Sequence, residues 1–361
     1  MLVDYEDFQK IRKELKSLKD LNRFPYSRGA LFTILSQKRV DMVKKRHPMA
    51  IRKLDEIASY WNRRKSVPPW LNLTPMMSIR ILLRAIGFTK AEIRNSLNNP
   101  QKVDDEKLEQ VIWNALFTDY VYSPLAVTHQ FARGRLGENI IKYWLERENI
   151  EFKDEYELRN ESSKTPDFYF PEPIRLGDRE IVWIESKALF GDPRTHKVYS
   201  KKQYHRYQEL FGDGYVVYWF GQVKGLDNNV RFLSNNFFSS RLKDALLDMR
   251  FYDSAASFFK DGSFRRMVDK FPINCFVNLG AEVPFECVEI PELMDREEDF
   301  SEYMRTKDFL EGMSKLIDLY YTHGEVMLIC EEKDWRKCHR RHISWALKNL
   351  GFDVVHLKHF G

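Results

Sequence analysis

Three charged side chains occupy positions in the sequence where they could act together. The segment IVWIESK, residues 181–187, starts with four apolar residues, which predicts a strand that enters a hydrophobic core, and it carries Glu185 and Lys187 two positions apart. Because side chains alternate between the two faces of a strand, Glu185 and Lys187 share one face. Asp167 follows a proline at the start of the preceding predicted strand, PDFYF. If the two strands are neighbours, we expect all three charges to meet at one edge of the sheet.

Such a group of side chains is suited to the hydrolysis of phosphate esters. The two carboxylates and the backbone carbonyl of Ser186 form an all-oxygen set, which favours Mg²⁺ or Mn²⁺. A cation held there would polarise a phosphodiester and lower the pKa of a bound water, and Lys187 could orient that water or stabilise charge on the phosphate oxygens. The alternative is an ordinary ion pair between Glu185 and Lys187 on a solvated face. The four apolar residues before Glu185 favour the metal site.

The same pattern resembles the PD-(D/E)xK nuclease superfamily. The resemblance implies a restriction-endonuclease-like core in which Asp167, Glu185 and Lys187 form the catalytic and metal-binding motif. It also implies supporting catalytic roles for Gln203, on the helix that follows the strands, and for Glu138, in the first turn of the helix that precedes them. The competing interpretations are a surface glutamine and a helix N-terminal acid that the helix dipole favours.

Residues 131–225 show the alternation of helix and strand that such a core requires. An amphipathic helix, GENIIKYWLERE, precedes the strands PDFYF and REIVWIESKALF, which the turn-rich PEPIRLGD separates. A helix that ends at Gly212 follows, with His196 and His205 expected on the surface. The nearly continuous apolar run GYVVYWFG predicts a strand covered on both faces. These elements predict a layered α/β domain.

Residues 1–130 are expected to form an all-helical domain. After a proline-punctuated connector, residues 66–75, the sequence up to Pro100 predicts two short helices joined by a turn at Gly87–Phe88. Two helices about such a turn suit a nucleic-acid-binding helix-turn-helix. An ordinary helical hairpin within a bundle fits this loose motif equally well.

Positive charge is concentrated in one segment of this helical region. Residues 23–65 contain twelve Lys and Arg but only three Asp and Glu, whereas the whole chain has a net charge of +5. Lys and Arg provide sequence-independent attraction to phosphates, although a solvated charged face is an equally good interpretation. The candidate nucleic-acid-binding residues are Lys38, Arg39, Lys44, Lys45, Arg46, Arg63, Arg64 and Lys65.

Residues 226–361 again alternate predicted helices and strands, and we expect a C-terminal α/β domain. Four side chains near its end raise the question of zinc: Cys330, Cys338, His339 and His342. Cys338 and His342 could chelate from one helix face, but no CxxC pair is present, so a zinc site is disfavoured and Cys330 is interpreted as a small buried thiol. Cys338, His339 and Arg340 form a candidate site of unknown role, either an anion pocket at a helix N-terminus or a reactive cysteine.

Longer segments resemble one family within the superfamily, the codanin-interacting nucleases. The similar segments lie within residues 29–222 and are, in order, SQKRVDMVKKRH, NNPQKVDDEKLEQVIWNALFTDYVYSPL, KTPDFYF, WIESKALFGD and QELFGDGYVVYWFG. The resemblance implies a nuclease related to Holliday-junction resolvases, with a DNA-binding helical half and branched or structured DNA as substrate. Because the chain continues well past this region, a codanin-like partner does not follow. The C-terminal part resembles an uncharacterised domain family with a Cys-His-Arg signature.

The composition excludes several classes of protein. Of the 361 residues, 43% are hydrophobic and 31% are charged, which is typical of a folded globular protein and not of a disordered chain. Four cysteines do not make a disulfide framework, no apolar stretch approaches the length of a membrane span, and MLVDYEDFQK has no secretory pattern. We therefore expect an intracellular protein without a membrane partner, cytoplasmic in a prokaryote and both nuclear and cytoplasmic in a eukaryote.

The combined interpretation is an α/β multidomain nuclease that depends on Mg²⁺ or Mn²⁺, with DNA as the favoured nucleic-acid partner. One alternative is a catalytically inert nuclease-fold adaptor that binds nucleic acid or protein. Another is an RNA-directed nuclease. A homodimer, which a symmetric junction would suit, and an unidentified protein partner are left open.

Overall fold

The computed structural model describes every residue except 161, 228, 260–272, 297–298 and 358–361. It has the mixed α/β, multi-part character that the sequence predicts. Two compact units are present, each formed from two separate stretches of chain. The first unit comprises Met1–Leu35 and Gln130–Asp248, and the second unit comprises Ser36–His129 and Met249–Gly361. The division into three consecutive domains stays a prediction.

The elements run through the chain in the following order. The helices are α1 (Tyr5–Glu14), α2 (Arg28–Ile51), α3 (Leu54–Arg64), α4 (Pro75–Ala85), α5 (Lys90–Asn98), α6 (Glu106–Thr118), α7 (Pro124–Arg147), α8 (Glu155–Leu158), α9 (Pro193–Tyr199), α10 (His205–Phe211), α11 (Arg241–Asp248), α13 (Phe300–Tyr303), α14 (Lys307–His323) and α15 (Arg340–Asn349). The strands are β1 (Leu2–Val3), β2 (Lys153–Asp154), β3 (Phe168–Leu176), β4 (Arg179–Lys187), β5 (Gly214–Tyr218), β6 (Gln222–Val223), β7 (Arg231–Phe232), β8 (Arg250–Ala255), β9 (Cys275–Asn278), β10 (Val288–Glu289), β11 (Val326–Cys330) and β12 (Asp353–His356). Within the described ranges, no helix combines the length and the apolar character that crossing a bilayer would require.

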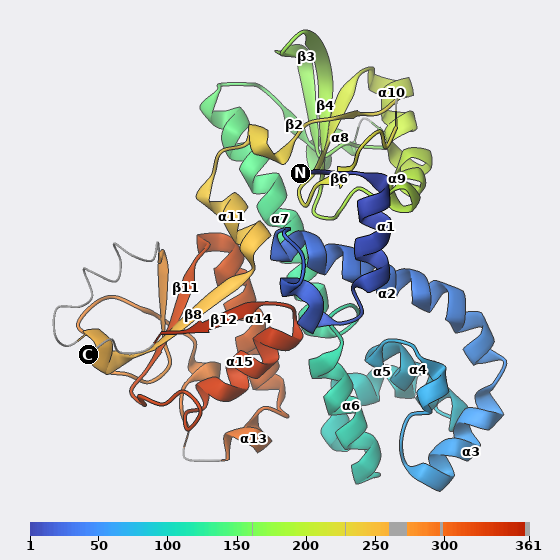
Figure 1. The fold of residues 1–361 in the computed structure, drawn as a ribbon, viewed down its shortest axis with the longest axis vertical. Coiled ribbons are helices and arrows are strands. Elements are labelled where there is room, and N and C mark those ends of the chain that lie inside the picture. The colour runs from blue at the N-terminus through green and yellow to red at the C-terminus, as the bar shows by residue number, and fades with distance from the viewer. Residues whose placement is uncertain (161, 228, 260–272, 297–298, 358–361) are drawn as a thin grey trace. The chain divides into compact units, whose positions relative to one another are not determined.

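The first unit is built around a five-stranded sheet in the order β2-β3-β4-β5-β7 (Figure 1). β3 and β4 are antiparallel, whereas β4, β5 and β7 are parallel neighbours. Helices α9 and α10 lie between β4 and β5 in the chain and provide the long crossover that a parallel pair needs. The middle of the sheet is fully buried at Trp183, Ile184, Val216 and Val217, as expected for strands covered on both faces.

The β3–β4 hairpin is longer than predicted. We expected residues 171–178, PEPIRLGD, to form a turn, but β3 continues through both prolines, and only Gly177 and Asp178 turn the chain. The pairing with β4 shifts register between Tyr169 and Ile174. Such an irregularity tolerates proline because the missing N–H leaves no gap in a regular ladder.

The N-terminal region is not wholly helical, so the all-helical expectation is wrong at its first residues. Leu2 and Val3 form β1, which pairs in parallel with Gln222 and Val223 of β6. A two-residue strand is too short to show an alternating pattern, and its partner lies far along the chain. Helices α1 to α6 otherwise agree with the prediction for this region.

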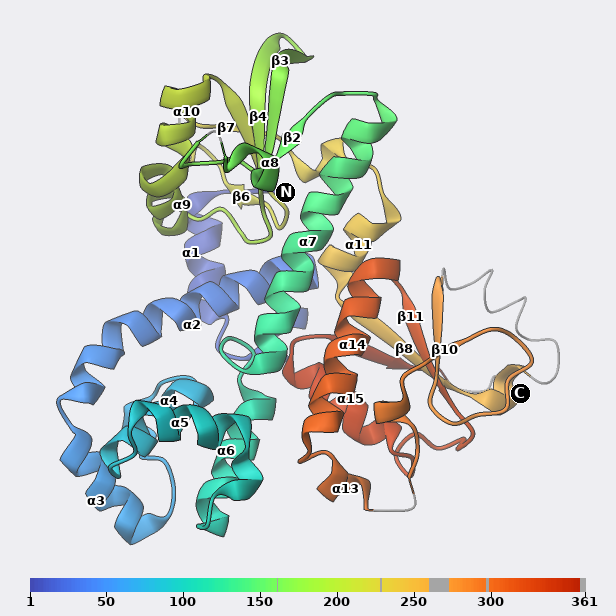
Figure 2. The same cartoon turned by 180° about the vertical axis from the view of Figure 1, so that it is seen from behind.

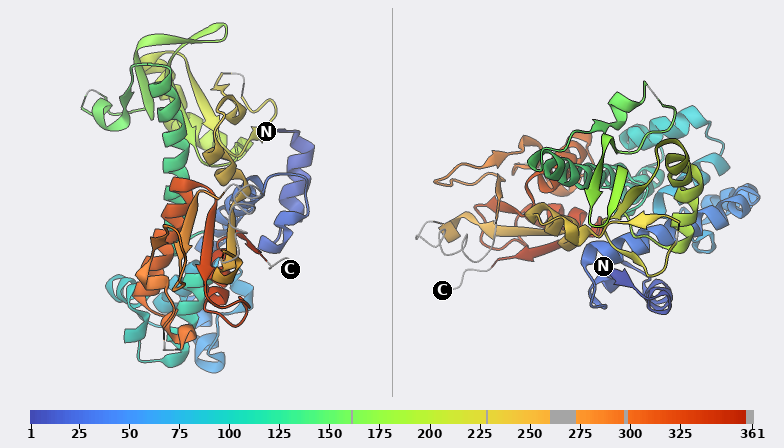
Figure 3. Two further views of the ribbon diagram at one scale, coloured as in Figure 1. Left: turned by 90° about the vertical axis from the view of Figure 1, so that its left-hand side faces the viewer. Right: turned by 90° about the horizontal axis from the view of Figure 1, so that it is seen from above.

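The second unit contains a parallel sheet in the order β10-β9-β11-β8-β12. Its central strand β11 is buried at every residue. Helix α14 packs against β11, and α15 packs against β12, as the views in Figures 2 and 3 show. The short strand β10 forms one edge of the sheet and β12 forms the other.

The remaining part of the second unit is helical. Helices α3, α4 and α6 pack together, and the predicted pair α4–α5 is present, with a positive φ of 98° at Gly87 in the connecting turn. The buried carboxylate of Asp119 accepts a hydrogen bond of 2.8 Å from the backbone N–H of Met76 and so caps the start of α4. The nucleic-acid-binding role of the pair stays a prediction.

Candidate active site

The register of two strands brings Asp167 next to Glu185. Phe168 on β3 pairs with Ile184 on β4, so Asp167 comes opposite Glu185. The backbone N–H of Asp167 donates to Glu185 Oε2 at 3.1 Å, and the backbone N–H of Ser186 donates to Asp167 Oδ2 at 2.7 Å. These reciprocal hydrogen bonds fix both carboxylates at the carboxyl end of β4.

Lys187 completes the cluster. Its Nζ pairs with Glu185 Oε1 and lies 5.3 Å from the centroid of the Tyr199 ring. The Glu185 side chain is 1% exposed and that of Lys187 is 13% exposed. A solvated surface pair, the competing interpretation from the sequence, does not describe this arrangement. A buried pair of this kind is stable only when its remaining lone pairs and protons have partners.

Ser186 faces the opposite side of β4. Its Oγ accepts a hydrogen bond of 2.8 Å from Trp219 Nε1. Trp219 packs so closely on α7 that a Cβ at Gly137 would lie 2.3 Å from the same nitrogen. Glycine at position 137 therefore lets the indole reach Ser186, and this contact holds the backbone between the two charged residues of β4.

Two buried carboxylates and one lysine leave an excess of negative charge. Burial raises the pKa of both Asp167 and Glu185 above their ordinary values, and the charge of Asp167 raises the pKa of Glu185 further. Burial lowers the pKa of Lys187, but the charges of Glu185 and Asp167 outweigh this effect and hold its pKa above the usual range. The lysine therefore keeps its proton, while the carboxylates lack sufficient positive charge around them.

The donor set fits a hard divalent cation. Asp167 and Glu185 offer only carboxylate oxygens, which Mg²⁺ and Mn²⁺ prefer. Such a cation would also supply the positive charge whose shortage raises the two pKa values. The groups that would hold it are the two carboxylates and, by its place between Glu185 and Lys187, the backbone carbonyl of Ser186.

Glu138 and Gln203 border the cluster. Glu138 on α7 has an exposed side chain, but partial desolvation of its carboxyl group, helped by the charge of Asp167, raises its pKa to about 7. Gln203 lies in the π-helical turn Ser200–Tyr204 between α9 and α10, and its Oε1 is buried without a hydrogen-bond partner among the described residues. An unpaired buried amide oxygen is costly and is a feature of sites that receive a water or a ligand.

The expectation that His196 lies on the surface is wrong. His196 is 3% exposed, its Nδ1 lies 3.0 Å from the Tyr218 hydroxyl, and its Nε2 lies 2.9 Å from Asp227 Oδ2. Both partners come from later segments of the chain, so no local pattern could reveal them. His205 is exposed, as expected.

Tyr207 is a supporting residue that the sequence did not reveal. Its hydroxyl donates to the carbonyl of Thr165 at 2.8 Å, and its ring packs edge-on against Trp183 at 5.4 Å between centroids. The tyrosine thus anchors the segment that leads into Asp167. Its position one helical turn after Gln203 was the only available signal.

The eight basic candidates lie on or just after α2 and α3. Five are exposed, namely Lys44, Lys45, Arg63, Arg64 and Lys65, and three are half-buried, namely Lys38, Arg39 and Arg46. Lys65 pairs with Asp105 at 2.9 Å, and Arg39 Nε donates to the Tyr120 hydroxyl at 3.1 Å. Lys44 and Lys45 make no ion pair with any residue that the structure describes.

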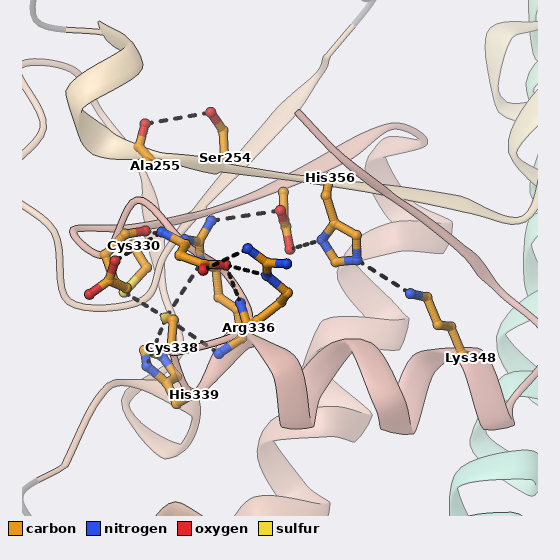
Figure 4. A network of polar contacts seen from close by, with 12 residues as sticks. Ser254, Ala255, Cys330, Arg336, Cys338, His339, Lys348 and His356 are labelled. Carbon is orange, nitrogen blue, oxygen red and sulfur yellow. Dashed lines mark hydrogen bonds and ion pairs between the residues drawn. The ribbon is translucent and has the colours of Figure 1, made fainter. Parts of the chain in front are cut away.

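The C-terminal candidates are buried at the start of α15 (Figure 4). Arg340 is 1% exposed and donates to Cys338 Sγ from Nε at 3.4 Å, while its guanidinium group faces Asp253 at 3.6 Å. The arginine is therefore engaged by protein groups and does not line an open anion pocket. The hydrogen bond between the sulfurs of Cys330 and Cys338 raises the pKa of Cys330 and lowers that of Cys338, to which His339 also contributes.

Two family models match the chain. One, described as "Protein of unknown function TPD sequence-motif", matches residues 104–237, which include Asp167, Glu185 and Lys187. The other, described as "Domain of unknown function DUF488", matches residues 289–347 in the second unit. No solved structure matches the chain.

Curated proteins are similar over a longer part of the chain. Proteins named CDAN1-interacting nuclease 1 from Bos taurus and Mus musculus are each 32% identical to it over 240 residues, and the protein of that name from Homo sapiens is 31% identical over 240 residues. Each match covers 60% of this chain and 84% of the relative. The chain therefore belongs to the CDAN1-interacting nuclease 1 family.

Proposed function

We propose that this chain is a divalent-metal-dependent nuclease that hydrolyses phosphodiester bonds in DNA. The observation that carries the proposal is the mutual contact of Asp167, Glu185 and Lys187 at the buried end of β4. The names of the relatives support the nuclease activity. In this proposal the first unit contains a PD-(D/E)xK core that uses Mg²⁺ or Mn²⁺.

Each residue of the cluster has a defined role. Asp167 and Glu185 hold the cation, which when bound supplies polarisation of the phosphodiester and lowers the pKa of water. Lys187, tethered by Glu185, directs its ammonium group at the same edge, where it orients the attacking water or stabilises charge on the phosphate oxygens. Because Lys187 keeps its proton, it acts as a hydrogen-bond donor and not as a general base.

Two bordering residues complete the proposed site. Gln203 has a buried amide oxygen that can accept a hydrogen bond from a water or from the substrate. Glu138 is a third carboxylate within electrostatic range of Asp167, and it loses its proton more readily when a cation is present.

Nucleic-acid binding is assigned to the basic residues of α2 and α3, with the α4–α5 pair as a helix-turn-helix. Lys44 and Lys45 are exposed cations that attract phosphates regardless of sequence. The preference for branched DNA rests on the resemblance to Holliday-junction resolvases. The relatives are named for an interaction with CDAN1; a protein partner of this chain and a homodimer on a symmetric junction are further parts of the proposal.

A panel of substrates tests this function. Linear duplex, single-stranded and four-way-junction DNA and matched RNA are incubated with Mg²⁺, Mn²⁺ or EDTA, using the wild-type chain and the Glu185→Gln variant. We expect DNA cleavage with either metal, a preference for the junction, and no cleavage with EDTA or the variant. Cleavage of RNA alone would instead identify an RNA-directed nuclease. Binding without cleavage under every condition would identify an inert adaptor.

A further inference from the structure

The end of β11 and the start of α15 bring two thiols and an imidazole together (Figure 4). Cys330 Sγ lies 3.2 Å from Cys338 Sγ, and Cys338 Sγ lies 3.5 Å from His339 Nδ1. The ligand atoms of these three residues all lie within 4.8 Å of one another. Asp295, two residues after Leu293, adds a carboxylate whose Oδ1 lies 3.3 Å from His339 Nδ1.

The four groups are all electron-pair donors that converge on one point. Cys330, Cys338 and His339 are 3%, 5% and 5% exposed, so bulk water does not separate them. His339 Nδ1 stands between the sulfur of Cys338 and the carboxylate of Asp295. Burying converging sulfur, nitrogen and oxygen donors is costly unless a cation joins them.

The separations are close to those of a tetrahedral zinc site. Zn–S bonds of about 2.3 Å and Zn–N bonds of about 2.0 Å imply an S···N separation of about 3.5 Å and an S···S separation of about 3.7 Å. The Cys338–His339 separation of 3.5 Å agrees with the first value. The two sulfurs would have to move apart by about 0.5 Å, which small rotations of the side chains can provide.

Arg340 supplies hydrogen bonds that stabilise a metal-bound thiolate. Its backbone N–H and its Nε–H donate to Cys338 Sγ at 3.5 Å and 3.4 Å. The guanidinium group is held in turn by the buried Asp253, whose other oxygen lies 2.7 Å from His356 Nδ1 (Figure 4). Partners behind the ligands fix the orientation of metal ligands and tune their affinity.

We propose that one zinc ion is bound in the second unit by four side chains: Cys330, Cys338, His339 and Asp295. Thiolate and imidazole ligands select zinc over the hard cations that suit carboxylates alone. The ion has a structural role, because it ties the end of β11, the start of α15 and the segment after Leu293 to one another. It is independent of the nuclease proposal, which concerns the first unit.

This proposal replaces the sequence-based interpretation, which disfavoured zinc. That interpretation relied on the absence of a CxxC pair and considered His342 as the helical partner of Cys338. In the structure His342 Nε2 accepts a hydrogen bond of 2.9 Å from Arg341 Nε, and His339 is the ring directed at the sulfur. Asp295 lies too far along the chain for any spacing rule to include it.

The zinc content of the 361-residue chain, purified without chelators and measured by mass spectrometry, tests the proposal. We expect one zinc ion per chain, and we expect Cys338→Ala and His339→Gln to lose it. Two matched controls should keep it. Cys275→Ala removes another free thiol that is also 5% exposed, and His342→Gln changes the nearby histidine of the same helix.

Cobalt substitution of the wild-type chain keeps the test valid if a variant fails to fold. We expect a thiolate-to-cobalt absorption band and the visible bands of tetrahedral cobalt, unchanged in Asp167→Asn, which alters the carboxylate cluster of the first unit. Wild-type protein without zinc and without the thiolate band would overturn the proposal. So would zinc that persists in a folded Cys338→Ala variant, or a metal-free protein with a disulfide between Cys330 and Cys338.

Discussion

The carboxylate cluster of the first unit and the thiol cluster of the second unit lie at equivalent places in two different sheets. Glu185 lies near the carboxyl end of the buried strand β4, and Cys330 is the last residue of the buried strand β11. In each case a sheet holds the first donor rigidly, and a separate segment brings the others. The donors differ: oxygen and an ammonium group in one, sulfur and nitrogen in the other.

This difference determines what each cluster can do. An oxygen set binds Mg²⁺ or Mn²⁺ with exchangeable positions, which suits hydrolysis of phosphate esters. A set of two thiolates, an imidazole and a carboxylate fills the coordination of zinc and suits a structural role. Removal of one ion should therefore stop a reaction, whereas removal of the other should weaken the fold.

The largest effect is expected from neutralising the carboxylates of the first unit. Asp167→Asn or Glu185→Gln removes a charged ligand of the cation, and we expect the cleavage rate to fall by at least about 100-fold, as for the loss of one group that stabilises a transition state. Titration with Mn²⁺ should show a parallel loss of affinity. Glu180→Gln, on the exposed start of the same strand, is the control and should cleave normally. Equal losses in the control would show that β4 merely tolerates no change of charge.

Chelation should separate the two clusters by their effect on stability. Loss of zinc from the second unit should lower the free energy of unfolding by about 4 kcal/mol when free zinc exceeds its dissociation constant 1,000-fold. Thermal unfolding with and without a zinc chelator measures this change. Omitting Mg²⁺ should stop cleavage with a much smaller change in the melting temperature. If chelation of zinc leaves the melting temperature unchanged, the structural role is wrong.

A pair of substitutions on α7 should sharpen the account of how β4 is supported. Gly137→Ala would push a methyl group into Trp219, which hydrogen-bonds Ser186, and should destabilise the fold by about 1–3 kcal/mol. Gly134→Ala meets nothing within 4 Å on the same helix and should stabilise it by up to about 1 kcal/mol. Urea unfolding of both variants gives the comparison. Similar values for the two would contradict the packing described for Trp219.

The smallest effect is expected from the basic surface. Replacing Lys44 and Lys45 by Ala should reduce the slope of log binding constant against log salt by about 0.9 for each phosphate that the variant no longer neutralises. Lys65→Ala, whose charge is already paired with Asp105, should change the slope less. Fluorescence anisotropy with a DNA duplex at several salt concentrations measures both. A larger change for Lys65→Ala would shift the proposed binding surface towards α3.

The sequence predicted those features that depend on local periodicity. Glu185 and Lys187 share a face because they are two apart on a strand, and the apolar run before them predicted the burial that is observed. The proximity of Asp167 followed from the assumption that consecutive strands pair, which β3 and β4 do. Helices with clear apolar spacing were likewise predicted at nearly the right positions.

Features that depend on distant partners could not be predicted in this way. His196 is buried because Asp227 and Tyr218 receive it, and β1 forms because β6 accepts two residues from the other end of the first unit's chain. The thiol cluster is another case, since Asp295 has no relation in spacing to Cys338. Two prolines in β3 gave a local signal for a turn, but the pairing with β4 outweighed it.

The cleavage activity of Lys187→Ala tests the central claim most directly. Mg²⁺-dependent cleavage of DNA by the purified variant is compared with that of the wild type, while circular dichroism and DNA binding are measured on the same samples. The account predicts that cleavage is abolished while folding and DNA binding are preserved. A variant that cleaves DNA at the wild-type rate would contradict the role of this lysine and, with it, the assignment of the carboxylate cluster as the active site.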